Sequence, residues 1–457
     1  MGRNNDNSET LWLVMARTCN LACDYCYQGG DHSAQRVHGL GLETLMSKAV
    51  LDKALPWAIE WTGHGRGNGR AEGLAKQLGS SPPPPPGGKL KVALYGGEPL
   101  LASPLIREIV PEWKAAFKAA GKEITFSATT NGTLLNESMR AFFKEQDVGI
   151  LLSLDGPEER HNASRPKVGG GPSWADIDPV SILKWRGPRL EIAWQLDPRH
   201  YFEADDIDRM LALGFKNQNY NLNWLEPWPD EARLRLQDFA KRAARRMSEG
   251  KLASYWHGRY MRAGTEQRMT QPCGLATHML ALTPEGYLYP SQEMAFTAFE
   301  PERAKGTAEH YRVGDVGNDP VLDQEALTRV GQIQTKDMKP PPPYDCDDCV
   351  AKATSIGGCH CRYIGQKPDD PSYRYDVPVG YCQSMRAMIT GLMQGYWVER
   401  KLTPPTEATP VQKVKGALAR HIGAQQAVKP NSHQPKPAPA PGPSFERIPD
   451  VVHIKVG

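Results

Sequence analysis

The sequence lacks the usual signals of a membrane or secreted protein. No uninterrupted apolar run among its 457 residues reaches the ~18 residues that a membrane-spanning helix needs. The N-terminal segment is polar and has no apolar signal core, and Asp6 breaks the pattern for N-terminal myristoylation. A strong charge of one sign is missing too, because 55 Lys and Arg oppose 52 Asp and Glu, for a net +3. Such a chain has no broad basic field, so we expect a cytoplasmic protein whose main partner is neither nucleic acid nor membrane.

Cysteine is missing from more than half of the chain. Cys19, Cys23 and Cys26 lie near the N-terminus, and no other cysteine precedes residue 273. The others form a late group: Cys273, Cys346, Cys349, Cys359, Cys361 and Cys382. Without a secretory signal, these groups do not indicate a disulfide framework. Clustered thiols in a reducing compartment indicate metal binding or catalysis instead.

Proline is plentiful, with 39 residues in a chain of 457 where average usage is about 5%. Its runs lie at 82–86, 340–343 and 430–449. The first run belongs to a Gly- and Pro-rich insertion at 62–89, which we interpret as an extended spacer. The last belongs to a tail at 396–457 that we expect to be flexible. The tail also has the composition of a polyproline ligand for a partner protein.

Between the two cysteine groups, strand and helix patterns alternate six times. Apolar, β-prone segments predict strands at 10–17, 90–95, 123–128, 148–154, 190–196 and 220–224. Helices are predicted after them, at 42–60, 103–119, 137–146, from 179, at 203–213 and at 230–249. Ser103-Pro104 and Asn136 are the expected caps of the second and third helices, and Gly214 is the expected stop of the fifth. Six successive strand–helix units predict a parallel α/β sheet, either barrel-like or doubly wound.

The first cysteine group has the spacing C-x3-C-x2-C, from Cys19 through Cys23 to Cys26. It directly follows the first predicted strand, at the sheet edge where parallel α/β proteins bind ligands. A closed zinc site or a ferredoxin-type cluster needs four protein ligands, and no fourth cysteine lies nearby in the sequence. The spacing therefore favours an iron–sulfur cluster with one iron open to an external ligand. The alternative is a zinc knuckle completed by a distant His or Cys.

Glycine and polar residues also follow the next three predicted strands. The second strand ends in Tyr95-Gly96-Gly97-Glu98-Pro99, whose glycines let the backbone approach a ligand and whose carboxylate can bind an ammonium group. The third ends in Thr129-Thr130-Asn131-Gly132. The fourth ends in Ser153-Leu154-Asp155-Gly156-Pro157, with His161 and Arg165 further on. Each string alone is an ordinary turn. Together they predict a ligand site at one edge of the sheet.

These strings together resemble the radical S-adenosylmethionine (radical SAM) superfamily. The cysteine run, with the aromatic Tyr25 before its last cysteine, is similar to the superfamily signature. The Gly-Gly-Glu-Pro, Thr-Asn-Gly and Ser-Leu-Asp-Gly-Pro strings resemble the subfamily with a C-terminal SPASM domain, which includes sulfatase maturases and peptide-modifying enzymes. The resemblance covers about residues 9–395. It implies a partial (β/α)6 TIM-like barrel over 9–250 and a cysteine-rich SPASM-like domain over 251–395.

The resemblance also implies a cofactor site. Cys19, Cys23 and Cys26 would hold a 4Fe–4S cluster, and S-adenosylmethionine would chelate its fourth iron. Residues at four strand ends would bind that cofactor: Tyr25 near the adenine, Gly96, Gly97 and Glu98 at the amino group, Asn131, and Ser153 and Arg165 near the ribose and carboxylate. One electron would cleave the sulfonium to a 5′-deoxyadenosyl radical, which takes a hydrogen atom from the substrate.

The late cysteines match the SPASM pattern incompletely. Serine stands at two expected cysteine positions, Ser291 and Ser355. One cluster of the family would retain only Cys273 and Cys359, whereas the other keeps three of its cysteines. The resemblance therefore implies a single auxiliary 4Fe–4S cluster, whose ligands would be Cys346, Cys349, Cys382 and either Cys359 or the additional Cys361. A zinc ion in the same cysteines is the alternative.

The expected function is modification of a peptide or protein side chain by hydrogen abstraction, through a cross-link or an oxidation. A reductant such as ferredoxin or flavodoxin would be a partner. A separate leader-peptide-binding protein is a further candidate partner, because no such domain fits before residue 10.

Three alternatives remain open: radical chemistry on a small molecule, formylglycine formation as in sulfatase maturases, and a non-catalytic iron–sulfur scaffold or electron carrier. Gln292 stands where the maturases carry an aspartate proton acceptor, and an amide is no base. Formylglycine formation is thus disfavoured unless Glu293 substitutes. Glu98 and the open cysteine motif argue against a carrier, which has no need to bind a sulfonium.

Overall fold

The computed structural model describes residues 8–26, 43–63, 88–185, 189–258, 278–297, 311–331, 338–346, 349–351, 354–355 and 375–400. Three candidate ligands, Cys273, Cys359 and Cys361, lie outside these ranges. The same holds for most of the 62–89 insertion and for the tail from residue 401 onward.

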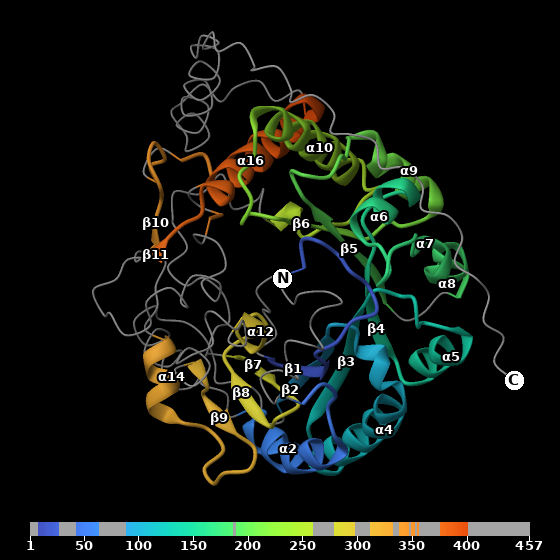
Figure 1. The fold of residues 1–457 in the computed structure, drawn as a ribbon, viewed down its shortest axis with the longest axis vertical. Coiled ribbons are helices and arrows are strands. Elements are labelled where there is room, and N and C mark those ends of the chain that lie inside the picture. The colour runs from blue at the N-terminus through green and yellow to red at the C-terminus, as the bar shows by residue number, and fades with distance from the viewer. Residues whose placement is uncertain are drawn as a thin grey trace, which may run out of the picture.

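Six parallel strands lie side by side in chain order and curve into an arc (Figure 1). They are β1 (Glu9–Ala16), β2 (Lys89–Gly96), β3 (Glu123–Thr130), β4 (Val148–Ser153), β5 (Leu190–Leu196) and β6 (Gln218–Leu222). Every strand predicted from the sequence is present, although β6 begins and ends before its predicted bounds, so that Trp224 lies beyond it. Because all six run in the same direction, their carboxyl ends meet at one edge.

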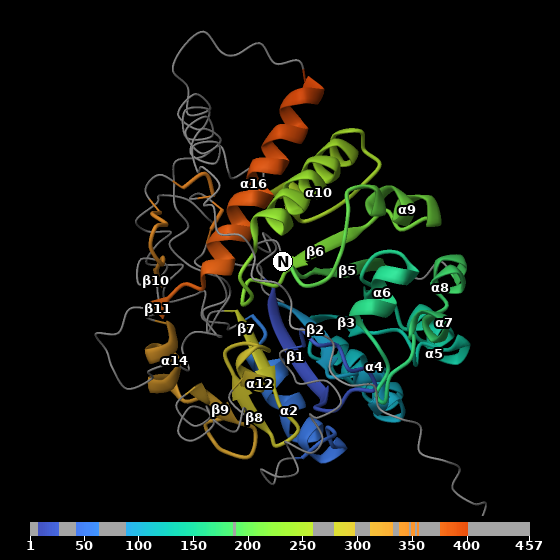
Figure 2. The same ribbon diagram turned by 45° about the horizontal axis from the view of Figure 1, so that its top comes forward.

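Helices cover the outer face of this arc, as in a partial TIM-like barrel (Figures 1 and 2). They are α2 (Lys48–Trp61), η2 (Pro99–Ala102), α4 (Ser103–Ala119), α5 (Glu137–Glu145), α6 (Glu158–Ser164), α7 (Trp174–Ile177), α8 (Pro179–Trp185), α9 (Asp205–Leu213) and α10 (Asp230–Ser248). The α/β fold class is confirmed: one strand–helix unit follows another, with Asn136 capping α5 and Gly214 ending α9.

Two helix starts differ from the prediction. Helix α2 begins at Lys48 rather than at residue 42, because the Ser47 side chain accepts the Val50 N–H and caps the helix there. Ser103 is the first residue of α4 rather than its cap. The 3-10 turn η2 precedes it, and its cap is Glu98, whose side chain accepts the Leu100 N–H.

The sheet continues past β1 into the C-terminal part of the chain. Strand β7 (Met279–Leu282) pairs in parallel with β1, and β8 (Tyr287–Tyr289) and β9 (Gly314–Asp315) follow antiparallel, which makes nine strands. The remaining elements are α12 (Met294–Thr297), α14 (Gln324–Gly331), and a small pair of β10 (Met338–Lys339) and β11 (Tyr375–Asp376). An open barrel leaves the outer edge of β1 unpaired. Strand β7 satisfies that edge, so residues expected in a C-terminal domain share a sheet with the barrel.

The last described helix, α16 (Val379–Arg400), lies along α10 and runs in the same direction (Figures 1 and 2). Two glycines one turn apart allow this contact. A Cβ atom on Gly391 would lie 2.1 Å from the Gln237 carbonyl oxygen, and one on Gly395 would lie 2.4 Å from that of Lys241. Only hydrogen fits at these positions, so α16 is packed backbone to backbone against the last helix of the barrel.

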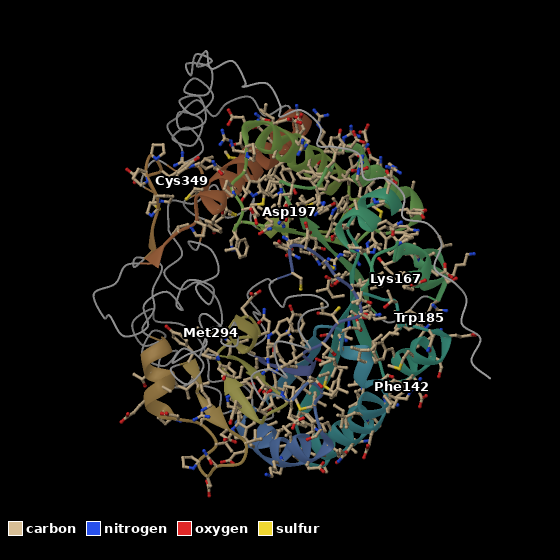
Figure 3. All side chains as sticks on the ribbon, viewed as in Figure 1. Phe142, Lys167, Trp185, Asp197, Met294 and Cys349 are labelled. Carbon is tan, nitrogen blue, oxygen red and sulfur yellow. The ribbon has the colours of Figure 1, made fainter. Side chains whose placement is uncertain are left out.

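The core fills the space between the sheet and its outer helices. Phe239 of α10 packs edge-on against Trp194 of β5 and Tyr220 of β6, with ring centroids 5.3 and 5.0 Å apart. In Figure 3, Phe142 and Trp185 lie on the outer helices, whereas Asp197 and Met294 lie inside the arc. Among the described helices, none combines the length and apolarity that crossing a bilayer would require.

Candidate active site

The loop that follows β1 carries the three N-terminal cysteines. It is held against the segment after α6, because the Ala22 N–H donates to the Pro166 carbonyl at 2.8 Å and Leu21 forms a bridge with Lys167. A turn closed by the Cys26 N–H and the Cys23 carbonyl, 3.1 Å apart, brings the last two cysteines together. The structure thus places all three thiols at the carboxyl end of β1, where the sequence predicted them.

The electrostatics of these thiols suit a cationic metal centre. Burial, with a smaller contribution from repulsion by the Cys26 thiol, raises the pKa of Cys19 and of Cys23 to about 12. Neutral thiols in such a site exchange their protons for metal cations, which stabilise the thiolates. The Leu21 N–H and the Asn131 side-chain amide point at the Cys19 sulfur, at 3.4 and 3.7 Å. Such donors are typical around iron–sulfur ligands and tune their potentials. The residues present therefore fit an iron–sulfur cluster.

Gly96 and Gly97 join the cysteine loop to the end of β2. The Gly97 N–H donates to the Ala16 carbonyl at 2.8 Å, and the Glu98 N–H donates to the Thr18 carbonyl at 2.9 Å. A Cβ atom would lie 2.2 Å from the Ala16 oxygen at Gly96 and 2.1 Å from the Thr18 oxygen at Gly97. The sequence suggested that these glycines open the backbone to a ligand. The structure adds a second reason for these glycines, because the start of the cysteine loop also approaches their backbone closely.

Glu98 is fully buried and joins two strand ends. Its Oε1 accepts from the Leu100 N–H at 3.0 Å and the Thr130 hydroxyl at 2.8 Å, and its Oε2 accepts from the Asn131 N–H at 2.7 Å. Burial raises the pKa of Glu98 to about 7, against the lowering effect of these three donors. A carboxylate oxygen can accept two hydrogen bonds, so Oε2 retains capacity for a cationic ligand.

Asn131 connects this carboxylate with the cysteine loop. Besides its contact with the Cys19 sulfur, its side-chain amide donates to Asn20 Oδ1 at 2.8 Å, and its Oδ1 accepts from the Thr133 hydroxyl at 2.7 Å. Asn131 therefore lies at the predicted site, where it contacts a thiol ligand through its side chain and Glu98 through its backbone. Ser153 ends β4 at the same edge, opposite Ala193 of β5.

Asp155 is the centre of a buried network that sequence reasoning did not include among the site residues. Its carboxylate pairs with Arg165, with Oδ2 2.9 Å from Nε and Oδ1 3.0 Å from Nη2. It also accepts from the Tyr25 hydroxyl, from the Ser164 hydroxyl at 2.9 Å and from the Gln195 N–H at 2.8 Å. Burial would raise the pKa of Asp155, but Arg165 and these donors outweigh burial and hold it below 3.8.

The network fixes two predicted site residues together. The Arg165 guanidinium lies over the Tyr25 ring, 5.3 Å from its centroid, a favourable cation–π geometry. Tyr25 is the residue before Cys26, so the network also anchors the cysteine loop. The Asp-Gly pair of this string is common in turns, which hid the role of Asp155. A carboxylate directly after a buried strand was the available signal.

His161 contacts the backbone of Arg165 through the Ser173 hydroxyl. Its Nδ1 accepts from the Asp155 N–H at 3.2 Å, so the ring proton is on Nε2, which lies 3.0 Å from the Ser173 hydroxyl. That hydroxyl donates to the Arg165 carbonyl at 2.6 Å. Burial, and then the charge of Arg165, lower the pKa of His161 to about 3. The imidazole is neutral and serves to position Arg165.

The C-terminal segment reaches the cysteine loop through Arg17. This arginine is 1% exposed and binds Glu285 through two contacts of 3.0 and 2.8 Å, and it donates to the Ala295 carbonyl at 2.9 Å. The Ser291 hydroxyl accepts from the Met294 N–H at 3.3 Å and caps the turn before Ala295. Ser291 is 2% exposed. The serine found at an expected cysteine position thus has a structural role at the start of α12.

Three late cysteines gather at the start of α16. Burial, and then the thiols of Cys349 and Cys346, raise the pKa of Cys382 to about 12. Ser355 lies beside the start of α16, with its hydroxyl 3.3 Å from that of Tyr381, the residue before Cys382. The ring of Tyr381 in turn packs edge-on against Trp224 beyond β6, at 5.7 Å. Figure 3 shows Cys349 beside α16. Cys346 and Cys349 thus lie near Cys382, whereas Cys273, Cys359 and Cys361 lie outside the described residues.

A parallel partial barrel with a three-cysteine loop after its first strand is the arrangement of a radical SAM domain. Residues 13–180 match the radical SAM superfamily. Domains of this superfamily bind a 4Fe–4S cluster and S-adenosylmethionine.

The curated relatives include a cysteine-type anaerobic sulfatase-maturating enzyme of Clostridium perfringens, 28% identical over 170 residues, which are 36% of this chain and 37% of that one. They also include a serine-type anaerobic sulfatase-maturating enzyme of Klebsiella aerogenes, 29% identical over 207 residues, or 45% of this chain and 44% of that one. The chain thus spans less than half the length of these two relatives.

The fold extends the likeness over more of the chain. The solved structure named anSMEcpe with bound AdoMet matches with a TM-score of 0.56 and 18% identity, and the match covers 91% of this chain and 99% of that one. At this identity the likeness concerns the fold alone. The chain is related to radical SAM enzymes of the SPASM type, as the sequence predicted.

Proposed function

We propose that the protein is a radical SAM enzyme that abstracts hydrogen from a side chain of a peptide or protein and thereby cross-links or oxidises it. The single observation that carries the proposal is the assembly at one sheet edge of Cys19, Cys23 and Cys26 with Glu98 and the Asp155 network. The curated sulfatase-maturating relatives support a protein substrate. One neighbour was solved with AdoMet and a peptide bound.

The three cysteines would hold the cluster, and the bound cluster would supply the electron that cleaves S-adenosylmethionine into methionine and a 5′-deoxyadenosyl radical. The protein orients the cofactor. In this proposal Glu98 binds its amino group, and Arg165, held by Asp155 and His161, is near its carboxylate. Tyr25, Gly96, Gly97, Asn131 and Ser153 complete the site. The electron comes from an external reductant such as ferredoxin or flavodoxin in a reducing, cytoplasmic compartment.

The test is anaerobic incubation of the reconstituted protein with S-adenosylmethionine and dithionite. We expect release of 5′-deoxyadenosine, and we expect none from a variant in which Cys19, Cys23 and Cys26 are all alanine. Full cluster loading without any 5′-deoxyadenosine would contradict the proposal and favour an electron carrier or scaffold. Co-expression with any short peptide found to be encoded beside the gene, followed by mass spectrometry, tests the substrate class. An unchanged peptide mass would instead favour a small-molecule substrate.

Formylglycine formation is a second candidate, since curated relatives are named sulfatase-maturating enzymes. Gln292 stands at the place of the expected base, next to the capping residue Ser291. An amide cannot take a proton there, so Glu293 is the only neighbour of suitable chemistry in this short stretch. Incubation with a sulfatase peptide would show an aldehyde product that disappears in Glu293→Gln if this candidate is correct.

The auxiliary centre is tested by metal analysis of anaerobically purified protein. We propose one cluster on Cys346, Cys349, Cys382 and a fourth cysteine, Cys359 or Cys361. Iron beyond one four-iron cluster per chain is expected. Zinc in place of that additional iron would contradict the proposal of an auxiliary iron–sulfur cluster.

A further inference from the structure

Residues after β5 and β6 form a polar cluster that the proposed cofactor site does not use. Asp197 directly follows β5, and its side chain is fully buried. Arg199 binds both of its carboxylate oxygens, with Nε 3.0 Å from Oδ1 and Nη2 2.8 Å from Oδ2. The Asn223 amide donates to Oδ2 at 2.6 Å. Two-point binding to a buried carboxylate fixes the position of the Arg199 guanidinium. Figure 3 shows Asp197 on the inner side of the arc.

This cluster reaches the cysteine loop through Asp24, the residue that follows Cys23. His200 Nε2 lies 2.9 Å from Asp24 Oδ1 and 3.1 Å from Oδ2. An ionised carboxylate only accepts hydrogen bonds, so Nε2 carries a proton and donates it. Arg199 Nη2 lies 3.9 Å from Asp24 Oδ2. The His200 ring also meets the Tyr25 ring edge-on, at 6.4 Å. Two consecutive residues after β5 therefore hold two consecutive residues of the cysteine loop.

The charge of Asp24 matters because it lies between cysteines of the same loop. A negative charge beside an iron–sulfur cluster opposes the addition of an electron, and net charge and hydrogen bonding are main determinants of cluster potential. The side chain of Asp24 is half exposed, whereas the His200 side chain is 23% exposed. The His200 N–H therefore both orients the loop and offsets part of the charge of Asp24. The Arg199 guanidinium adds a weaker ion pair, because it also binds Asp197 and lies 3.5 Å from Glu226 Oε1.

We propose that Arg199 and His200 are positioning residues that hold Asp24 and offset its charge, and so raise the potential at which the N-terminal cluster accepts its electron. This inference rests on the proposed function, because it requires a cluster on Cys19, Cys23 and Cys26. It assigns a role to the connection after β5, which contributes no residue to the cofactor site described above.

The experiment is a redox titration of the full-length, reconstituted protein, followed by electron paramagnetic resonance. The signal that changes when S-adenosylmethionine is added identifies the N-terminal cluster. His200→Phe keeps an aromatic ring beside Tyr25 but removes the donor to Asp24, so the midpoint potential should fall. Asp24→Asn removes the charge, so the potential should rise. His200→Gln retains an N–H donor and should remain near the wild type.

A matched control is His257→Phe, which removes a histidine whose Nδ1 lies 2.6 Å from the Tyr396 hydroxyl on α16. Its cluster potential should be unchanged. Opposite shifts in His200→Phe and Asp24→Asn support the proposal, because a general loss of structure would move both variants in the same direction. Equal potentials, or shifts of one sign, overturn it.

Two further outcomes are informative. If His200→Phe loses its iron, two measurements still test the proposal. A rise in potential in Asp24→Asn, together with a wild-type potential in His200→Gln, supports it. A fall or no change in Asp24→Asn overturns it. If the wild-type protein shows no signal that responds to S-adenosylmethionine, the proposed function fails instead, which iron analysis would reveal separately.

Discussion

Replacing Asp155 by asparagine tests the network that connects the cysteine loop with Arg165. The asparagine retains one acceptor oxygen, for the Gln195 N–H and one Arg165 N–H. Its amide nitrogen replaces Oδ2, which accepts from the Tyr25 and Ser164 hydroxyls and faces Arg165 Nε. Removing one partner of a buried ion pair costs about 3–5 kcal/mol. The Tyr25 and Ser164 hydroxyls also lose an ionised acceptor, and hydrogen bonds to charged groups contribute about 1.5–3 kcal/mol each. We therefore expect a total loss of at least about 5 kcal/mol.

The free energy of unfolding, measured by anaerobic urea denaturation, provides the assay. A matched control is Glu159→Gln on α6, which changes a carboxylate to an amide in a half-exposed ion pair with Arg209. That change should cost less than about 1 kcal/mol. In Asp155→Asn combined with Arg165→Gln, both charges are absent, and the loss should be smaller than the sum by about 1–3 kcal/mol.

The reasoning would be refuted by an Asp155→Asn variant as stable as the Glu159→Gln control, or by a strictly additive double variant. The pH dependence gives a second check. Because the pKa of Asp155 is held below 3.8 in the folded state, its stabilising contribution is present above pH 3.8 and is lost as the pH falls below that value.

Three further predictions concern the loop and the last helix. Burial raises the pKa of Glu98 from 4.5 to about 7, so the folded protein retains a proton that the unfolded chain releases. The free energy of unfolding should therefore fall by roughly 3 kcal/mol between pH 4.5 and 7. Urea denaturation at several pH values measures this fall, and Glu98→Gln should abolish it. Gly97→Ala places a Cβ atom 2.1 Å from the Thr18 carbonyl oxygen and should lower the iron content after reconstitution. In the control Gly149→Ala, the added Cβ atom would lie 3.1 Å from the movable Arg189 side chain, and this variant should retain its iron. Gly391→Ala should overpack α16 against α10 and lower the free energy of unfolding by about 1–3 kcal/mol, and with it the melting temperature. An unchanged melting temperature would contradict the close helix contact.

The strands and the cysteine loop were predictable because their signals are local. Each strand is a short apolar run bounded by turn residues, and parallel strands present their carboxyl ends at one edge whatever their order. That rule by itself places Cys19, Glu98 and Asn131 at one edge of the sheet. Helix starts were less certain, as α2 shows, because a single serine cap outweighs the apolar period of the residues before it.

The contacts between distant segments were not predictable. Nothing in the sequence near Arg17 indicates Glu285, and nothing near Asp24 indicates His200, since these pairs are far apart in the chain. The continuation of the sheet through β7 was missed for the same reason. It depends on the free edge of β1, which exists only once the barrel has formed.

The sequence by itself determined the chemistry of this protein: the number of thiols, their spacing, and the α/β order that presents them at a sheet edge. The tertiary structure decided which groups control those thiols. Asp155 and His200 acquire their roles only because the ends of β4 and β5 lie beside the loop of β1. Thiol spacing is fixed by covalent connectivity, whereas burial, pKa values and charge pairing depend on residues that folding alone brings within a few ångströms.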